Sequence, residues 1–279
     1  MQGKVVVITG ATSGIGQIAA ERLAGMGARM VLVARDKARG EAALARLRTA
    51  NPSANHTIHY ADLSSVADTK RVAAEIAAAE PRIDVLINNA GAVFSSRQVT
   101  PDGLEMTFAT NHMAYWIMTH GLRERLVASK PSRVVSTASD AHKGQSLDLD
   151  DLQATKSYSA FKVYGRSKLA NILFTRALAR RTEKAGVTAN CLHPGFVATR
   201  FGDRSGGLLS IVIRVAKMFA ITPEKGAETI VYLASSPDVA EVSGQYFYQS
   251  RPATPTKQAL DDATGEKLWE ITKKLAGVS

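Results

Sequence analysis

Two side chains that could exchange a proton with a substrate lie four positions apart, at Tyr164 and Lys168. The surrounding sequence has helical spacing, so both side chains are expected on one face of a helix, one turn apart. A free tyrosine has a pKa of about 10 and is a poor acid-base catalyst at neutral pH. A neighbouring ammonium favours the phenolate, and we therefore expect Lys168 to lower the pKa of Tyr164. The alternative is a pair of side chains on a solvated helix face.

A glycine-rich turn near the N-terminus gives this pair a context. The turn, TGATSGIG at residues 9–16, follows a short β-branched strand and precedes a stretch with helical spacing. Such a turn binds dinucleotide phosphates, because glycines let the backbone approach the pyrophosphate and the helix N-terminus offers free N–H groups. An ordinary tight turn is the alternative. The expected cofactor-binding residues of the turn are Gly10, Thr12, Ser13, Gly14, Ile15 and Gly16.

Further landmarks follow in order along the chain. With the two motifs above, they make the chain similar to the short-chain dehydrogenase/reductase family from about residue 3 to about residue 250. The stretch SKLANILFT at residues 167–175, together with residues 111–112 and 267–270, resembles the retinol-dehydrogenase-like branch. The landmarks are Asn88-Asn89-Ala90-Gly91, Asn111, Ser139 and Pro194-Gly195.

The alternation of strands and helices predicts an α/β fold of the Rossmann type. We expect one domain over residues 1–279, with a single doubly wound parallel sheet and helices on both faces. Strands are predicted at residues 4–9, 29–34, 55–60, 83–88, 132–139, 187–193 and 244–248. Helices are predicted at residues 14–27, 36–50, 64–80, 101–128, 157–184 and 223–236. Gly10, Asn88, Ser139 and Pro194 all fall at or after strand ends, where ligands bind in such sheets.

The resemblance implies catalytic roles for four residues. Tyr164 would exchange the proton with the substrate oxygen, and Ser139 would hydrogen-bond the same oxygen. Lys168 would lower the pKa of Tyr164 and hold the nicotinamide ribose. Asn111 resembles the residue that holds a water in the proton path to Lys168. Local backbone bonding by Ser139 and a structural bond from Asn111 are the competing interpretations.

The residues after the second predicted strand bear on the choice of cofactor. An NAD enzyme usually places an acid here to bind the ribose hydroxyls, but this chain has Ala34 followed by Arg35. Alanine cannot repel a 2′-phosphate and a guanidinium can bind one, so we expect NADP(H). Asp36 could pair with Arg35, although capping of the next helix is the favoured role.

The remaining cofactor contacts are implied by the resemblance alone. Asp62 and Leu63 are expected beside the adenine, and the Val197 backbone and the Thr199 hydroxyl beside the nicotinamide carboxamide. Outside the glycine turn, the implied cofactor-binding residues are Arg35, Asp62, Leu63, Asn88, Ala90, Gly91, Tyr164, Lys168, Pro194, Gly195, Val197 and Thr199.

Two long segments beside the expected site lack a fixed structural explanation. Residues 140–163 separate Ser139 from Tyr164 and exceed the length usual in the family. Residues 196–221 are apolar and contain three glycines, which suits a lid over a lipophilic ketone, aldehyde or alcohol. A helix that only packs on the core or on a second subunit is the alternative. A C-terminal helix is predicted at residues 256–276.

Composition excludes several classes of site. The formal net charge is +10, but the basic residues are not interleaved with aromatic ones, so we expect no nucleic-acid partner. A single cysteine, Cys191, cannot form an intrachain disulfide. The six histidines lack zinc-ligand spacing, so no metal is expected.

The chain shows no segment that suggests membrane insertion. The first strand begins at Lys4 and no apolar run reaches spanning length, so we expect no signal peptide, no integral membrane segment and a cytoplasmic location. The resemblance implies a homodimer through residues 101–128 and 157–184, although the long segment before Tyr164 could obstruct it.

These observations favour an NADP(H)-dependent alcohol dehydrogenase or carbonyl reductase. A regulatory protein that keeps the fold and binds the dinucleotide without turnover is the competing hypothesis. The complete set Asn111, Ser139, Tyr164 and Lys168 favours the enzyme, because binding alone does not need these four side chains together.

Overall fold

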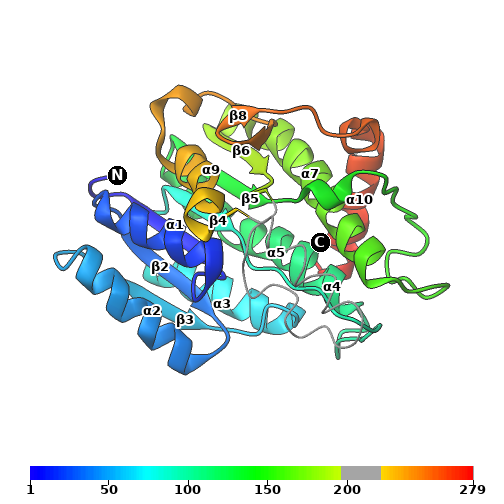
Figure 1. Ribbon diagram of the computed structural model, residues 1–279, viewed down its shortest axis with the longest axis horizontal. Coiled ribbons are helices and arrows are strands. Elements are labelled where there is room, and N and C mark those ends of the chain that lie inside the picture. Colours follow the sequence, from blue (N-terminus) through cyan, green and yellow to red (C-terminus); the bar gives the residue numbers. More distant parts are fainter. Residues whose placement is uncertain (196–220, 279) are drawn as a thin grey trace.

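A computed structural model describes residues 1–195 and 221–278, and in this part of the chain eight strands form one sheet (Figure 1). The strand order is β3-β2-β1-β4-β5-β6-β7-β8, and every neighbouring pair is parallel except β7 with β8. The strands are β1 (Val5–Thr9), β2 (Arg29–Ala34), β3 (Thr57–Tyr60), β4 (Val85–Asn88), β5 (Ser132–Thr137), β6 (Val187–Leu192), β7 (Tyr246–Tyr248) and β8 (Arg251–Pro252). The predicted α/β fold with a doubly wound sheet is confirmed.

The central strands are apolar runs because helices cover both of their faces. In β1, the side chain of Val7 packs in the cluster that includes Val72 and Trp116, whereas Ile8 packs with Leu23. Successive side chains of a strand point to opposite faces. One face of the sheet is therefore covered by α3 (Val66–Ala79) and α5 (Ala114–Gly121), and the other by α1 (Gly14–Gly25) and α9 (Pro223–Ser235).

The helices follow the predicted order. They are α1 (Gly14–Gly25), α2 (Lys37–Ala50), α3 (Val66–Ala79), α4 (Met106–Phe108), α5 (Ala114–Gly121), α6 (Arg123–Ala128), α7 (Ala160–Thr182), α9 (Pro223–Ser235) and α10 (Asp262–Leu275). The side chain of Asp36 accepts the backbone N–H of Arg39 at the start of α2, which confirms the capping role. None of the helices in the described ranges is long and apolar enough to span a bilayer.

The prediction of one continuous helix at residues 101–128 was wrong, because the first helix begins later and the segment is divided into several elements. The buried Glu105 carboxylate accepts the backbone N–H groups of Thr107 and Phe108 and so begins α4 at Met106. A π-helical turn at Ala109–Met113 then leads into α5, and α6 is separate. Side-chain bonds from distant residues, described below, hold this turn, so local spacing could not reveal it.

Two smaller differences concern the strands. β5 ends at Thr137 rather than at residue 139, because Ser139 turns the chain into a 3-10 helix (Asp140–His142). β8 was not predicted, since its two residues are exposed and pair antiparallel to β7.

The C-terminal helix α10 lies against α7, at the end of the molecule away from α2 (Figure 1). It begins at Asp262, after a 3-10 turn (Lys257–Leu260), rather than at residue 256. Ion pairs join Arg176 of α7 to Asp262 and Arg180 to Glu266. The indole of Trp269 stacks on Phe174 with 5.7 Å between ring centroids. The last helix is therefore packed onto the helix that carries Tyr164 and Lys168.

Candidate functional site

The glycine turn is packed too closely for side chains at two positions. Gly10 has a φ of +72°, and a Cβ there would lie 2.8 Å from the Cα of Ala90. A Cβ at Gly16 would overlap both the Gly10 carbonyl oxygen and the Asn89 amide nitrogen. The turn can therefore fold over the end of β4 only with glycine at both places.

The end of β4 holds the glycine turn through Thr9 and Asn89. The Thr9 hydroxyl oxygen accepts the backbone N–H groups of Asn89 and Ala90, each at 3.0 Å. The side-chain amide of Asn89 donates to the carbonyls of Thr9 and Gly10 at 3.1 and 3.3 Å. Asn88, which was predicted to contact the cofactor, is fully buried, and its side-chain amide donates to the Thr119 hydroxyl of α5 at 2.9 Å. Alternation along a strand places the two neighbouring asparagines on opposite faces.

The N-terminus of α1 lies at the edge of the sheet formed by the carboxyl ends of the parallel strands, which we call the rim. Ser13 is exposed and occupies the N-cap position, where it makes no capping bond with the described residues. Thr12, Gly14 and Ile15 are partly exposed. Backbone N–H groups of the first turn of this twelve-residue helix thus point to a place where an anion can bind.

The exposed side chain of Arg35 follows the buried Ala34 at the end of β2. Within residues 1–195 and 221–278, Arg35 forms no ion pair. The Asp62 carboxylate, after β3, accepts both the backbone N–H and the hydroxyl of Ser64, and Leu63 packs on the core. Because β1, β2 and β3 are parallel, these residues share the edge of the sheet with the glycine turn.

The four residues with implied catalytic roles come together beyond β4 and β5. Lys168 is buried, and its ammonium donates to the Thr137 carbonyl at 2.9 Å. It lies 5.6 Å from the centroid of the Tyr164 ring. The Ser139 hydroxyl hydrogen-bonds the Tyr164 side chain. Tyr164, Lys168 and Ser139 therefore form one cluster.

Asn111 joins this cluster through structural bonds. Its side-chain oxygen accepts the Ala92 N–H at 2.8 Å, and its amide donates to the Ala92 carbonyl and to the Ser167 hydroxyl, each at 3.0 Å. Both amide hydrogens are thus used within the protein. The side chain of Asn111 thus links the segment after β4 to α7 by hydrogen bonds. This is the structural role that the sequence offered as the alternative to water binding.

The pKa values of the central pair move in opposite directions. Burial lowers the pKa of Lys168 to about 7. Burial raises the pKa of Tyr164 to about 12, although the hydrogen bond with Ser139 acts the other way. The expected lowering of the Tyr164 pKa was wrong for the residues of the chain alone, because desolvation of the phenolate outweighs their favourable interactions.

Gly91 lies between the glycine turn and the cluster of Tyr164, Lys168 and Ser139. A Cβ at Gly91 would lie 3.3 Å from the Asn111 side-chain oxygen and 3.4 Å from the Lys168 ammonium. The preceding residue, Ala90, is the one that Gly10 contacts. The two motifs that are about 150 residues apart in sequence therefore border one continuous rim of the sheet.

Other implied residues extend this rim or fall outside the described ranges. Gly195 has a φ of +89° and donates its N–H to the His193 ring at 3.2 Å, which fixes the turn after β6. Val197, Thr199 and the proposed lid, apart from Ile221, lie outside the described residues. Among the residues that the structure describes, no group of three His, Cys, Asp or Glu side chains could hold a metal ion.

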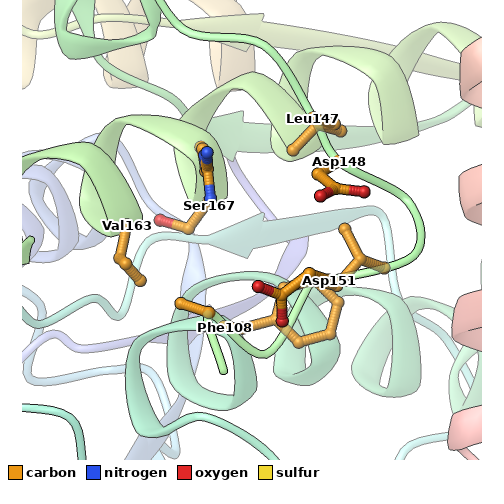
Figure 2. A pocket seen from close by; sticks show the side chains of 9 residues that line it. Phe108, Leu147, Asp148, Asp151, Val163 and Ser167 are labelled. Atoms are coloured by element: carbon orange, nitrogen blue, oxygen red, sulfur yellow. The ribbon is translucent and has the colours of Figure 1, made fainter. Parts of the chain in front are cut away.

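A small cavity lies between α7 and the segment at residues 147–152 (Figure 2). Its volume is about 10 Å³, and Phe108, Asp151, Val163 and Ser167 are among the residues that line it. This volume suits one water molecule, whereas binding sites for small organic molecules enclose several hundred Å³. The cavity is therefore not a substrate site.

Known proteins resemble this chain over most of its length. Residues 4–206 match the family model described as short chain dehydrogenase. Retinol dehydrogenase 14 from Mus musculus is 40% identical, with 100% of this chain and 87% of that protein aligned. Retinol dehydrogenase 12 from Mus musculus is 38% identical, covering 99% of this chain and 87% of the relative.

Two solved structures share the fold. An uncharacterised protein from Mycobacterium Paratuberculosis superposes with a TM-score of 0.79 at 29% identity, covering 100% of this chain and 95% of that one. The Pseudomonas aeruginosa RhlG/NADP active-site complex superposes with a TM-score of 0.71 at 25% identity, covering 88% and 94%. This chain thus shares its fold with a protein whose structure is a complex with NADP at its active site.

Proposed function

The chain belongs to the short chain dehydrogenase family, in its retinol-dehydrogenase-like branch, and on this premise we propose what its site does. It is an oxidoreductase of that family. The proposed reaction is hydride transfer between NADP(H) and a lipophilic aldehyde or ketone, or the corresponding alcohol. The observation that carries the proposal is the place of Gly91, where an added Cβ would lie 3.3 Å from the Asn111 side-chain oxygen and 3.4 Å from the Lys168 ammonium. The neighbouring residue Ala90 is the one against which Gly10 packs.

The residues of the rim fit a dinucleotide. The pyrophosphate would lie against the turn at Gly10–Gly16, where absent side chains leave backbone N–H groups accessible. Arg35 would hold the 2′-phosphate of the adenine ribose, since the neighbouring Ala34 carries no competing charge. The RhlG complex contains NADP, which supports the same cofactor here. When bound, NADPH supplies the hydride.

Tyr164 serves as the proton donor in the proposed reduction. Burial raises the pKa of Tyr164 to about 12, so its phenol holds its proton at neutral pH. The phenol would give this proton up only as hydride transfer builds an alkoxide on the substrate oxygen, because an alkoxide is a stronger base than a phenolate. Ser139, which hydrogen-bonds the same phenol, holds that oxygen beside Tyr164. The cluster of Tyr164, Ser139 and Lys168 is thus arranged to act as an acid on a carbonyl.

Lys168 has two tasks in the proposal. It would hold the nicotinamide ribose, as the family resemblance implies, and its charged form would offset part of the rise that burial causes in the pKa of the nearby phenol. Because the pKa of Lys168 is about 7, its charge responds to modest changes in its surroundings at neutral pH. Oxidation of an alcohol needs Tyr164 to lose its proton and therefore depends more strongly on this charge.

The substrate class is proposed from sequence and relatives together. The apolar segment at residues 196–221 follows the Pro194–Gly195 turn at the rim, and the relatives named above are retinol dehydrogenases. A long, lipophilic aldehyde or alcohol would match both observations. Retinaldehyde, aromatic ketones and long-chain aldehydes are the compounds to test first.

The test measures consumption of NADPH and NADH against a panel of such carbonyl compounds. We expect turnover with at least one lipophilic aldehyde, a higher kcat/KM with NADPH, and a drop of at least about tenfold in that preference for Arg35→Asp. A matched control is Arg39→Asp, an exposed arginine on the same segment. Tight NADPH binding without turnover of any compound would contradict the proposal that the protein is an active oxidoreductase. Equal kcat/KM values with NADPH and NADH would contradict the role of Arg35.

A further inference from the structure

A chain of buried polar side chains connects the catalytic lysine to the C-terminal helix. The Thr137 carbonyl, which accepts from Lys168, also accepts from the side-chain amide of Asn171 at 3.5 Å. On its other side, Asn171 contacts His112 at 3.3 Å, and His112 contacts the Thr272 hydroxyl of α10 at 3.0 Å. Lys168, Asn171, His112 and Thr272 are each at most 2% exposed.

The chemistry of the partners fixes the direction of each hydrogen bond. The Asn171 amide nitrogen must face the carbonyls of Thr137 and Asn111, the latter at 2.9 Å, because carbonyls only accept. The Asn171 oxygen therefore faces His112 Nδ1, which must carry the proton. His112 Nε2 is left as an acceptor for the Thr272 hydroxyl. Burial lowers the pKa of His112 to about 4, so the ring is neutral at neutral pH.

Asn171 meets two backbone groups that the site depends on. The Asn111 carbonyl lies in the π-helical turn, where the usual i→i+4 bonding of the backbone is changed. The Thr137 carbonyl is the group that the Lys168 ammonium bonds. A change in Asn171 thus alters two hydrogen bonds at once, one to the backbone carbonyl of Asn111 and one to the carbonyl that Lys168 bonds.

We infer that Asn171 is a positioning residue for Lys168, and that His112 and Thr272 hold it in place so that α10 is coupled to the active site. This inference rests on the proposed function, since it assigns to Asn171 the placement of the lysine that holds the cofactor. It gives the C-terminal helix a role in cofactor binding and turnover, in addition to its packing on α7.

The hydrogen-bond directions are tested without any activity measurement. Nitrogen-15 NMR of histidine-labelled protein separates ring nitrogens that carry a proton from those that do not, and His112→Gln identifies the signals of His112. We expect a neutral ring protonated at Nδ1. A ring protonated at Nε2 would reverse the bonds to Asn171 and Thr272 and would overturn the inference.

The coupling is tested with variants at both ends of the chain of bonds. Thr272→Val removes the hydroxyl that donates to His112 Nε2. Asn171→Leu removes the side-chain bonds to the carbonyls of Asn111 and Thr137 and the bond to His112. We expect NADPH to dissociate about threefold more readily, with a similar fall in kcat, in Thr272→Val, and at least about tenfold effects in Asn171→Leu. Thr272→Ser keeps the hydroxyl and should restore both quantities.

Thr182→Val is the matched control. Thr182 is a buried threonine of α7 whose hydroxyl bonds only the carbonyls of Leu178 and Val187, among the described residues. The Thr182→Val variant should lower the melting temperature about as much as Thr272→Val does, but it should leave NADPH affinity and kcat unchanged. Equal NADPH affinities in Thr272→Val and Thr182→Val would overturn the inference. A wild-type protein that reduces no carbonyl would refute the proposed function, and the ordering of NADPH affinities would still decide the role of Asn171.

Discussion

Replacing the buried amine of Lys168 should stabilise the protein while abolishing turnover. Lys168 is 2% exposed, and within residues 1–195 and 221–278 its one hydrogen bond is to the Thr137 carbonyl. Burial lowers its pKa from 10.5 to about 7. Lys168→Met keeps a linear side chain of similar length without the charge, so it removes the cost of burying an ammonium.

The size of this effect follows from proton linkage. The unfolded amine binds a proton below pH 10.5 and the folded amine only below about pH 7, so the unfolded state binds more protons between these values. The free energy of unfolding is therefore unaffected by this amine above pH 10.5 and decreases as the pH falls from 10.5 toward 7. The loss at pH 7 is about 4 kcal/mol.

The hydrogen bond to Thr137 offsets part of this gain. Its loss costs about 1 kcal/mol, which leaves a net stabilisation of about 3 kcal/mol at pH 7. At 2–4 °C per kcal/mol for a protein of this size, the melting temperature should rise by roughly 6–12 °C. The difference in free energy of unfolding between Lys168→Met and the wild type should decrease by about 3 kcal/mol between pH 7 and pH 9.5.

The assay is thermal and urea unfolding of both proteins without cofactor, at pH 7 and pH 9.5. Lys162→Met, which changes an exposed lysine of the same helix, is the control and should change stability by less than about 0.5 kcal/mol. A Lys168→Met variant that melts at or below the wild-type temperature at pH 7 would refute the reasoning. A difference in stability between Lys168→Met and the wild type that is the same at pH 7 and pH 9.5 would also refute it.

Three further predictions follow from the same structure. Gly16→Ala places a methyl group against the Gly10 carbonyl and should destabilise the protein by about 1–3 kcal/mol and weaken NADPH binding, as measured by urea unfolding and by NADPH fluorescence. Wild-type stability should fall between pH 7 and pH 4.5 by about 2 kcal/mol more than that of His112→Gln, because unfolded His112 gains its proton near pH 6.5 and the folded ring only near pH 4. Ser139→Ala should lower kcat at least about tenfold and leave NADPH affinity unchanged, since Ser139 bonds the Tyr164 hydroxyl.

The sequence was sufficient for the parts of the fold that local pattern determines. Apolar β-branched runs marked the central strands, and the glycine turn marked the first strand-to-helix connection because close packing against Ala90 permits nothing larger at Gly10. The order of elements then placed the ends of β1, β4, β5 and β6 at one edge. Asn111, Ser139, Tyr164 and Lys168 accordingly meet there.

The parts that could not be predicted depend on contacts between distant residues. The π-helical turn at Ala109–Met113 involves Asn171, 60 positions away from Asn111, and Thr272 is 160 positions from His112. Asn89 could have been found from strand alternation, which separates it from Asn88. The pKa of Tyr164 depends on how deeply the phenol is buried, and spacing between Tyr164 and Lys168 carries no information on burial.

The most direct measurement of the central claim is the turnover of Tyr164→Phe. With a lipophilic aldehyde accepted by the wild type, we expect kcat for NADPH oxidation to fall by about 10²-fold or more, while NADPH affinity stays within about twofold. Tyr158→Phe, which removes a hydroxyl that bonds the Phe94 carbonyl, should retain turnover. Near-normal kcat in Tyr164→Phe would show that this phenol does not deliver the proton and would contradict the account.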